Sequence, residues 1–409
     1  MGKTKLNEKL FDSLLPLLAV LAAFIVGAVI LRLQGVNPLE AYKAMIVGAF
    51  GSKNGLADTL VKATPLLLVG LGIAIAFRGG VINIGAEGQL IVGALLTTYL
   101  GLQLGDRMNG VVVIIIGLFA GALMGGIWGA IPGYLKAQLG VNEILSTIMM
   151  NQIAIQIGYY LLRGPMIDPA ELEAGTNIPH SARLARTVDM PRFTDIAKSL
   201  GLTKSSSDLN LTGYAKEIYG VLVEPTRLHS GFIFAIVMAI LIYVFLWRTT
   251  IGYRIRAVGL NPHASRYAGI NVKRNMVLSM TLSGLFAGLA GAVEILGLHH
   301  RMFEPVAVSA GYGFSGIVAA LFGKLHPLGM IPSSILFGGL LVGGDKMQRA
   351  MQVPQVLIQA ILGLVVLFVV STDYFVRKRQ NRRVSVDSGA DDKSEPTVPP
   401  AQSSAEAST

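Results

Sequence analysis

Long apolar runs alternate with short polar connections along most of the chain. A helix needs about 20 apolar residues to cross the hydrocarbon core of a bilayer. The runs therefore predict about ten membrane-spanning helices, of which the eighth and ninth are short enough to be partly re-entrant. They lie near 12–33, 56–77, 86–105, 110–132, 143–162, 230–247, 276–298, 311–323, 328–344 and 354–375. The predicted fold class is an all-α polytopic integral membrane protein.

Lysine and arginine are concentrated in alternate connections between these runs. The N-terminal segment 1–11, the connection 248–275 and the segment just after residue 376 are all basic. Because cytoplasmic loops carry an excess of Lys and Arg, we expect these three segments inside the cell. The pattern predicts a transmembrane domain over 12–376 with both termini in the cytoplasm.

Three segments are expected outside the membrane core. The segment Asn37–Phe50 is amphipathic and is expected at the outer interface. Residues 163–230 form a long polar stretch with several prolines and apolar patches, which predicts an external loop with a small ordered lobe. The tail 377–409, which is rich in Ser, Ala, Pro, Asp and Glu from Val384 to Thr409, is predicted to be disordered.

Glycines recur every fourth residue in the fourth apolar run. Small residues at this spacing form a smooth ridge on one helix face, against which a second helix can pack closely. The seventh run repeats the pattern with Gly284, Gly288 and Ala292. We interpret both as helix-packing surfaces. The ridge of the fourth run consists of Gly117, Gly121, Gly125, Gly129 and Gly133.

A glycine-rich segment from Arg78 to Gln89 separates the second and third runs and brings Asn83, Glu87 and Gln89 into the membrane zone. A charged side chain at bilayer depth costs about 2.5–3.5 kcal/mol on insertion scales, so Glu87 should face the protein interior or water. Broken helices with freed backbone groups often build translocation paths, but a cytoplasmic turn with polar caps is the other interpretation. Four residues separate Asn83 from Glu87, so they would share one face of a continuing helix.

Further polar residues lie in the fifth and seventh runs. Asn151 and Glu294 are candidates for the same path, while Asn142 suits a helix N-cap. His299 and His300 are adjacent, and no carboxylate stands at the spacing of a metal site on the same helix. We therefore expect no metal.

The composition narrows the function further. Hydrophobic residues make up 52% of the 409 positions and charged residues 14%, cysteine is absent, and the net charge is +10. The positive charge lies beside apolar runs, which indicates membrane orientation and not nucleic-acid binding. The GxGxxG pattern from Gly311 to Gly316 follows no predicted strand, and Gly323-Lys324 lacks the rest of a P-loop. We expect no cofactor, no catalytic residues and no enzyme activity.

The connection 248–275 contains a short helix with signals at both ends. Asn261 is a good N-cap, Pro262 suits the first helical position, and Gly269 supplies a left-handed exit. Ala264, Tyr267 and Ala268 fall at i, i+3 and i+4 and give a small apolar face. A capped basic helix at the inner surface is typical of a docking element.

Three segments carry a resemblance to a known family. GGVINIGAEGQLIVGALL, RAVGLNPHASRYAGINV and SGLFAGLAGAVEILG are similar to segments of the permease subunits of bacterial ATP-binding-cassette importers. The subgroup includes branched-chain amino acid, ribose-type sugar and nucleoside importers, and the match covers roughly residues 10–376. The NIGAEGQ form resembles the nucleoside branch. Relative to that branch, the part from Thr194 to Pro225 looks like an insertion.

The resemblance implies a function and a set of partners. It implies a permease in the cell (inner) membrane that moves a small polar solute, most simply a nucleoside, along a path shared with a second, related permease subunit. It implies an extracytoplasmic substrate-binding protein and a separate ATPase. The ATPase would receive a coupling helix formed by Gly259, Asn261, Pro262, Ala264, Tyr267, Ala268 and Gly269.

Two alternatives stay open at this point. One is a permease for a ribose-type sugar. The other is a proton-coupled secondary transporter that uses Glu87, Glu143 or Glu294 at the bilayer midplane and needs no docking helix.

Overall fold

The computed structural model describes residues 2–371, apart from 177, 203–207, 210–211, 355, 362, 366 and 369–370. The segment 377–409, predicted to be a disordered tail, lies outside the described residues. Within the described part the chain is helical, and an isolated antiparallel bridge between Arg192 and His229 is its only β pairing. The prediction of an all-α fold is confirmed for these residues.

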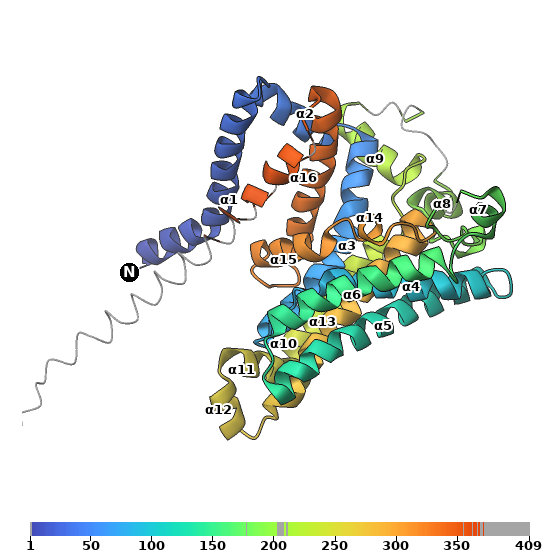
Figure 1. The fold of residues 1–409 in the computed structure, drawn as a ribbon. Helices are drawn as coiled ribbons and strands as arrows, with labels where there is room; N and C mark the ends of the chain where they lie inside the picture. Colours follow the sequence, from blue (N-terminus) through green and yellow to red (C-terminus); the bar gives the residue numbers. More distant parts are fainter. Residues whose placement is uncertain are drawn as a thin grey trace, which may run out of the picture.

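The helices follow the predicted order (Figure 1). The first half of the chain forms α1 (Gly2–Leu33), α2 (Pro38–Phe50), α3 (Lys53–Arg78), α4 (Ala86–Leu104), α5 (Gly110–Leu139) and α6 (Glu143–Arg163). The lobe between α6 and α10 contains α7 (Pro169–Ala174), the 3₁₀ turn η1 (Arg186–Val188), α8 (Phe193–Ser199) and α9 (Gly213–Val223). The second half forms α10 (Gly231–Arg248), α11 (Thr250–Leu260), α12 (Pro262–Tyr267), α13 (Val272–Glu294), the π turn η2 (Ile295–His299), α14 (Pro305–Ser309), α15 (Tyr312–Phe322) and α16 (Met330–Met351).

Five of these segments are long and apolar enough to cross a membrane, which makes the chain a multi-pass membrane protein. They are Lys53–Arg78, Gly110–Leu139, Gly231–Arg248, Val272–His299 and Pro305–Phe322. Helices also cover most described residues of the other predicted runs, including the shorter apolar segments Leu18–Leu33 and Val356–Val365. The helix α16 is longer than the predicted run 328–344. It continues through Asp345, whose carboxylate pairs with Lys62 at 2.6 Å.

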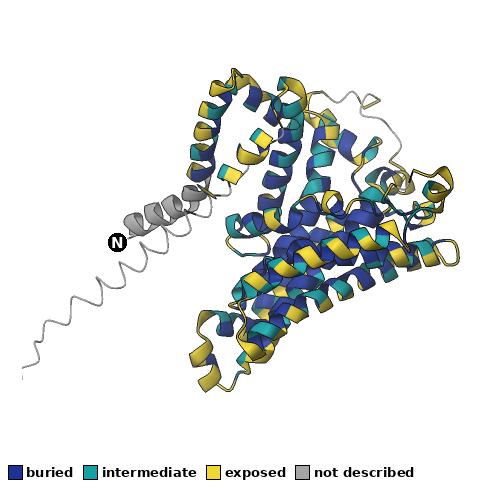
Figure 2. Cartoon of the chain, in the orientation of Figure 1, coloured by how far each residue is buried: buried dark blue, intermediate teal, exposed yellow. Residues whose placement is uncertain are grey.

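The helices α3 and α13 occupy the centre of the molecule. In α3, every residue from Leu66 to Ala76 is buried. Pro65 lies inside this helix without ending it. Figure 2 shows this buried interior and the exposed outer faces of the surrounding helices. Since exposed apolar side chains are common on α5 and α10, these outer faces suit contact with lipid.

The glycine ridge of α5 packs against the small residues of α13, as predicted. A Cβ atom on Gly288 would lie 2.2 Å from the carbonyl oxygen of Gly121, and one on Gly125 would lie 2.3 Å from that of Gly284. The helix α4 also approaches α13, since a Cβ atom on Gly93 would lie 2.5 Å from the Cα of Gly288. Any side chain at these positions would separate the helices, so glycine sets their close spacing.

Candidate functional site

The predicted break between the second and third runs is present between α3 and α4. The helix α3 ends at Arg78, and Gly80 adopts a left-handed conformation with φ +75°. Residues 81–84 have no regular structure, and α4 begins at Ala86. Asn83 therefore precedes α4, and the expectation that Asn83 and Glu87 share a helix face is wrong. The chain needs these extra residues to turn from one helix into the next.

Asn83 lies at the centre of a buried hydrogen-bond network. Its side-chain amide donates to Gln89 Oε1 and to the hydroxyl of Ser283 on α13, both at 2.8 Å. Its Oδ1 accepts from the backbone N–H of Gly85 at 2.9 Å and from Gln89 Nε2 at 3.2 Å. The break is thus tied to α13, and both polar side chains of the segment have partners in the interior.

Asn151 of α6 holds the first turn of α4. Its Oδ1 accepts from the backbone N–H of Gly88 at 2.8 Å, and its Nδ2 donates to the carbonyl oxygen of Ile84 at 3.0 Å. Gly88 permits this approach, because a Cβ atom there would lie 2.8 Å from the Cα of Asn151. Asn151 therefore satisfies one of the free N–H groups at the N-terminus of α4. Asn142, by contrast, caps its own helix α6.

Glu87 connects α4 to the start of α15. Its Oε2 accepts from the backbone N–H of Gly313 at 2.7 Å, and its Oε1 accepts from that of Gly311 at 3.1 Å. Gly311 has φ +72°, and a Cβ atom on Gly313 would lie 2.4 Å from the backbone nitrogen of Glu87. The GxGxxG segment therefore receives a carboxylate of this chain at a helix N-terminus, where free N–H groups and the helix dipole favour negative charge.

Glu294 lies at the other end of the buried region, as the last residue of α13. It is fully buried, and no group of the described residues donates a hydrogen bond to either carboxylate oxygen. The imidazole of His299 lies beside it, with Nε2 3.3 Å from Oε2, without making a hydrogen bond. The spacing argument used for α-helices missed this pair, because the π turn η2 lies between the two residues.

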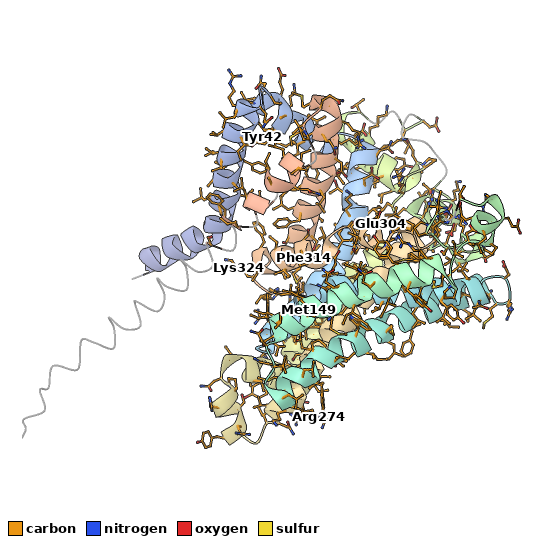
Figure 3. The ribbon with its side chains drawn as sticks, in the orientation of Figure 1. Tyr42, Met149, Arg274, Glu304, Phe314 and Lys324 are labelled. Atoms are coloured by element: carbon orange, nitrogen blue, oxygen red, sulfur yellow. The ribbon has the colours of Figure 1, made fainter. Side chains whose placement is uncertain are left out.

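The predicted docking helix is α12, which projects with α11 from one end of the molecule (Figure 1). Asn261 caps it by accepting from the backbone N–H of Ala264 at 3.0 Å, and Gly269 leaves it with φ +76°. Ala264 and Ala268 are exposed, and Tyr267 is 95% exposed. The lobe helices α7 and α8 lie toward the opposite end (Figure 1), and Figure 3 labels Arg274 close to the α11–α12 projection.

The base of the α11–α12 projection is packed against the break itself. A Cβ atom on Gly259 would lie 2.0 Å from the carbonyl oxygen of Arg78 and 2.9 Å from the backbone nitrogen of Gly80. Arg78 donates through Nε to the carbonyl oxygen of Leu325 at 2.7 Å, and its guanidinium stacks on Trp247 at 4.7 Å. The base of the projection therefore contacts the segment that leads to Asn83 and Glu87.

The lobe between α6 and α10 is ordered over its described residues and is attached to the π turn η2 and the residues that follow it. Backbone N–H groups of Ser181, Leu184 and Met190 donate to carbonyl oxygens at Met302, His300 and Leu296, respectively. The prediction of a small ordered lobe is confirmed for these residues. The presumed insertion contributes α8 and α9, and Glu224 after α9 pairs with Lys53 at the start of α3.

Two adjoining cavities lie where the lobe meets α3, α13 and α16. The first, of about 320 Å³, is lined by Arg192, Arg227, Gly297, Leu298 and His299. The second, of about 480 Å³, shares Arg192 and Arg227 and adds Lys346, Arg349 and the first turns of α3. Four basic side chains against one carboxylate, that of Asp58, give this surface a positive potential.

The five long apolar segments and the glycine-packed helices are those of a multi-pass membrane protein. The family model for the permease component of branched-chain amino acid transport systems matches residues 55–370, and the chain belongs to this family. No solved structure is significantly similar.

Several curated relatives match nearly the whole chain. It is 34% identical to the guanosine ABC transporter permease protein NupP of Bacillus subtilis, over 90% of this chain and 96% of the relative. It is 33% identical to the glucose ABC transporter permease protein TsgB13 of Haloferax volcanii, over 89% and 88%. It is 31% identical to the nucleoside ABC transporter permease protein NupB of Lactococcus lactis, over 89% and 92%. All three names describe transport subunits.

Sequence reasoning did not find all members of the site. It missed Ser283 as the partner of Asn83, and it dismissed the GxGxxG segment as a nucleotide motif without giving it another role. The signal was available in part, because a glycine-rich helix start can receive any anion, including a carboxylate of the same chain.

Proposed function

We propose that the chain is one permease subunit of an ATP-binding-cassette importer for nucleosides in the cell membrane of its host. Membership of the permease family supports the class of transporter. The nucleoside assignment is supported by two relatives with guanosine or nucleoside in their names, at 34% and 31% identity over about nine tenths of the chain. The single structural observation that carries the proposal is the exposed helix α12.

Its exposure suits a helix that docks on a separate ATPase. Leu260, just before the helix, is 88% exposed, and the apolar face of Ala264, Tyr267 and Ala268 contacts no other part of the described chain closely enough to be buried. An unpartnered apolar face beside basic residues is the form of a helix-in-groove contact. The partner would cover Tyr267 in its groove, with Arg266 at the polar rim.

The packing of Gly259 suggests how ATP hydrolysis reaches the path. Movement of α12 shifts α11, and Gly259 transmits that shift to the carbonyl of Arg78 and to Gly80, because there is no space between them to absorb it. The break then moves relative to α13 and α15, which hold Asn83 and Glu87. A rigid contact at a helix break is a suitable hinge for alternating access.

The polar residues of the break form the gate in this proposal. Asn83, Gln89 and Asn151 fix the N-terminus of α4, while Glu87 joins it to α15. In the state described here all four face protein groups, which fits a closed gate. Glu294, which lacks hydrogen-bond donors, is placed on the path on the outer side. Both termini and α12 are assigned to the cytoplasm, and the span number is kept at about ten.

Two further partners complete the proposed importer. Bacillus subtilis and Lactococcus lactis each contribute a second guanosine or nucleoside permease, NupQ and NupC, to which this chain is only 29% and 27% identical. The chain thus resembles one member of each pair more than the other, which supports a second, related permease beside it. The basic cavity surface near Arg227 and Arg349 suits acidic groups of an extracytoplasmic binding protein.

The glucose-transporting relative keeps a simple sugar as the second candidate substrate. A nucleoside contains a sugar, so a translocation path for nucleosides can share features with a path for simple sugars. A proton-coupled secondary transporter is less well supported, because it requires no docking helix and its relatives would not be ATP-binding-cassette permeases.

Replacement of Ala268 by Glu tests the coupling role. A charge on the apolar face should exclude α12 from an apolar groove, since an unpaired buried carboxylate costs several kcal/mol. In the reconstituted complex, Ala268→Glu should abolish the stimulation of ATPase activity by loaded binding protein. Ala174→Glu, which places the same change on the exposed lobe, should leave it intact. Full stimulation in an assembled Ala268→Glu complex would overturn the docking assignment.

A further inference from the structure

Glu294 differs from the other buried glutamate of the site in one respect. Glu87 accepts two backbone hydrogen bonds, whereas both oxygens of Glu294 lack a donor among the described residues, although the side chain is fully buried. A buried carboxylate without donors is unfavourable for folding, and such groups are usually kept for function. Its missing donors would then come from a ligand.

The backbone leaves α-helical geometry directly after Glu294. Residues Ile295–His299 form a π turn, and His300 ends it in a left-handed conformation with φ 55°. On an α-helix with about 3.6 residues per turn, residues five apart point in clearly different directions. The π turn instead brings His299 to Glu294, with Nε2 3.3 Å from Oε2. Such turns occur frequently at functional sites.

His299 also reaches the first of the two outer cavities. It lines the cavity of about 320 Å³ together with Arg192 and Arg227, and one face of its ring contacts Phe303 in an edge-to-face arrangement at 4.9 Å. His299 therefore lies beside the buried carboxylate of Glu294 and also lines the cavity.

The chemistry around the cavity restricts the ligand. A carboxylate accepts hydrogen bonds at two oxygens and is suited to two neighbouring donors on one molecule. Arg192 and Arg227 disfavour cations, so the donors should belong to a neutral solute. Guanosine has two such pairs: the vicinal hydroxyls of its ribose, and the ring N–H with the exocyclic amino group of its guanine.

We infer that Glu294 is a specificity-determining residue whose carboxylate accepts hydrogen bonds from two adjacent donors of the transported nucleoside, and that His299 separates it from the outer cavity. The inference rests on the proposed function and names the site at which that function selects its solute. Removal of one donor leaves a carboxylate oxygen unpaired, which penalises the analogue strongly.

Transport of matched analogues by the complete complex tests this inference. Proteoliposomes would contain both permeases and the ATPase, with binding protein saturated by guanosine, 2′-deoxyguanosine or inosine, so that its own affinity does not limit the rate. We expect the wild type to transport guanosine at least about tenfold faster than one of the two analogues, and Glu294→Gln to reduce that ratio by about tenfold. Loss of the ratio for 2′-deoxyguanosine identifies the ribose hydroxyls, and loss for inosine identifies the guanine edge.

Controls separate this inference from the proposed function. Glu173→Gln, on the exposed lobe, should retain the wild-type ratios. If Glu294→Gln does not assemble, Glu294→Asp, which keeps the charge but moves it, is judged by the same ratios. Equal rates for all three solutes in the wild type, or unchanged ratios in the Glu294 variants, would overturn the inference alone. Absence of ATP-dependent guanosine uptake by the wild type would overturn the proposed substrate and the inference with it.

Discussion

The contact between Glu87 and the start of α15 gives a prediction whose size follows from the structure. Glu87→Ala leaves the backbone N–H groups of Gly311 and Gly313 without their acceptor. Each buried donor left unpaired costs about 1–3 kcal/mol. The loss is therefore about 2–6 kcal/mol, and the lower half of this range is expected, because the site at Gly311 is only partly buried.

Glu87→Gln changes the same contact far less. Its remaining carbonyl oxygen can keep the shorter bond, 2.7 Å to Gly313, while the bond to Gly311 is lost. Loss of a buried charge offsets part of this cost. We expect a destabilisation of about 1–2 kcal/mol for Gln, clearly smaller than for Ala. Transport should fall in both variants if the charge holds the gate, whereas assembly with the ATPase should persist.

Two measurements on the same preparations decide this prediction. The free energy of unfolding is measured in detergent from the loss of helicity, and uptake is measured in the reconstituted complex. Glu173→Ala, an exposed carboxylate on the lobe, is the control for removal of charge. Wild-type stability in Glu87→Ala would refute the energetic argument. Wild-type uptake in both Glu87 variants would mean that the segment between α3 and α4 is only a turn.

Two other predictions concern topology and pH. In intact cells, an impermeant thiol reagent should label Ser199→Cys on the lobe and not His263→Cys on α12, and the cysteine-free chain gives no background; the reverse pattern would overturn the orientation. Burial, together with the charges of His300 and Arg192, lowers the pKa of His229 from 6.5 to about 4. The folded state therefore prefers the neutral ring, so its stabilisation is complete above about pH 6.5 and is lost toward pH 4, by about 3 kcal/mol. The free energy of unfolding should fall less over this range in His229→Gln, and parallel pH profiles would contradict the assignment.

The sequence predicted those parts of the fold that depend on local pattern. The apolar runs became helices, the break between 78 and 86 is present, and the ends of α12 follow from Asn261 and Gly269. The glycine ridge predicted close packing, and Gly121 and Gly125 do lie against α13. These features need only helix geometry, capping and residue size.

The contacts between distant segments could not be predicted in the same way. Asn83 and Gln89 were identified, but nothing local indicates that Ser283, two hundred residues later, completes their network. The π turn changed the neighbour of Glu294, because helix-spacing rules assume α geometry. Both the partner of Asn83 and the neighbour of Glu294 depend on how the chain packs in three dimensions. The role of these residues in transport stays a prediction.

ATP-dependent uptake of labelled guanosine into proteoliposomes tests the central claim most directly. The chain would be reconstituted with its second permease, the ATPase and the binding protein. The account predicts uptake that requires ATP and the ATPase subunit and that persists when a protonophore removes the proton gradient. Uptake driven by a proton gradient without the ATPase would contradict the account and support the secondary-transporter alternative.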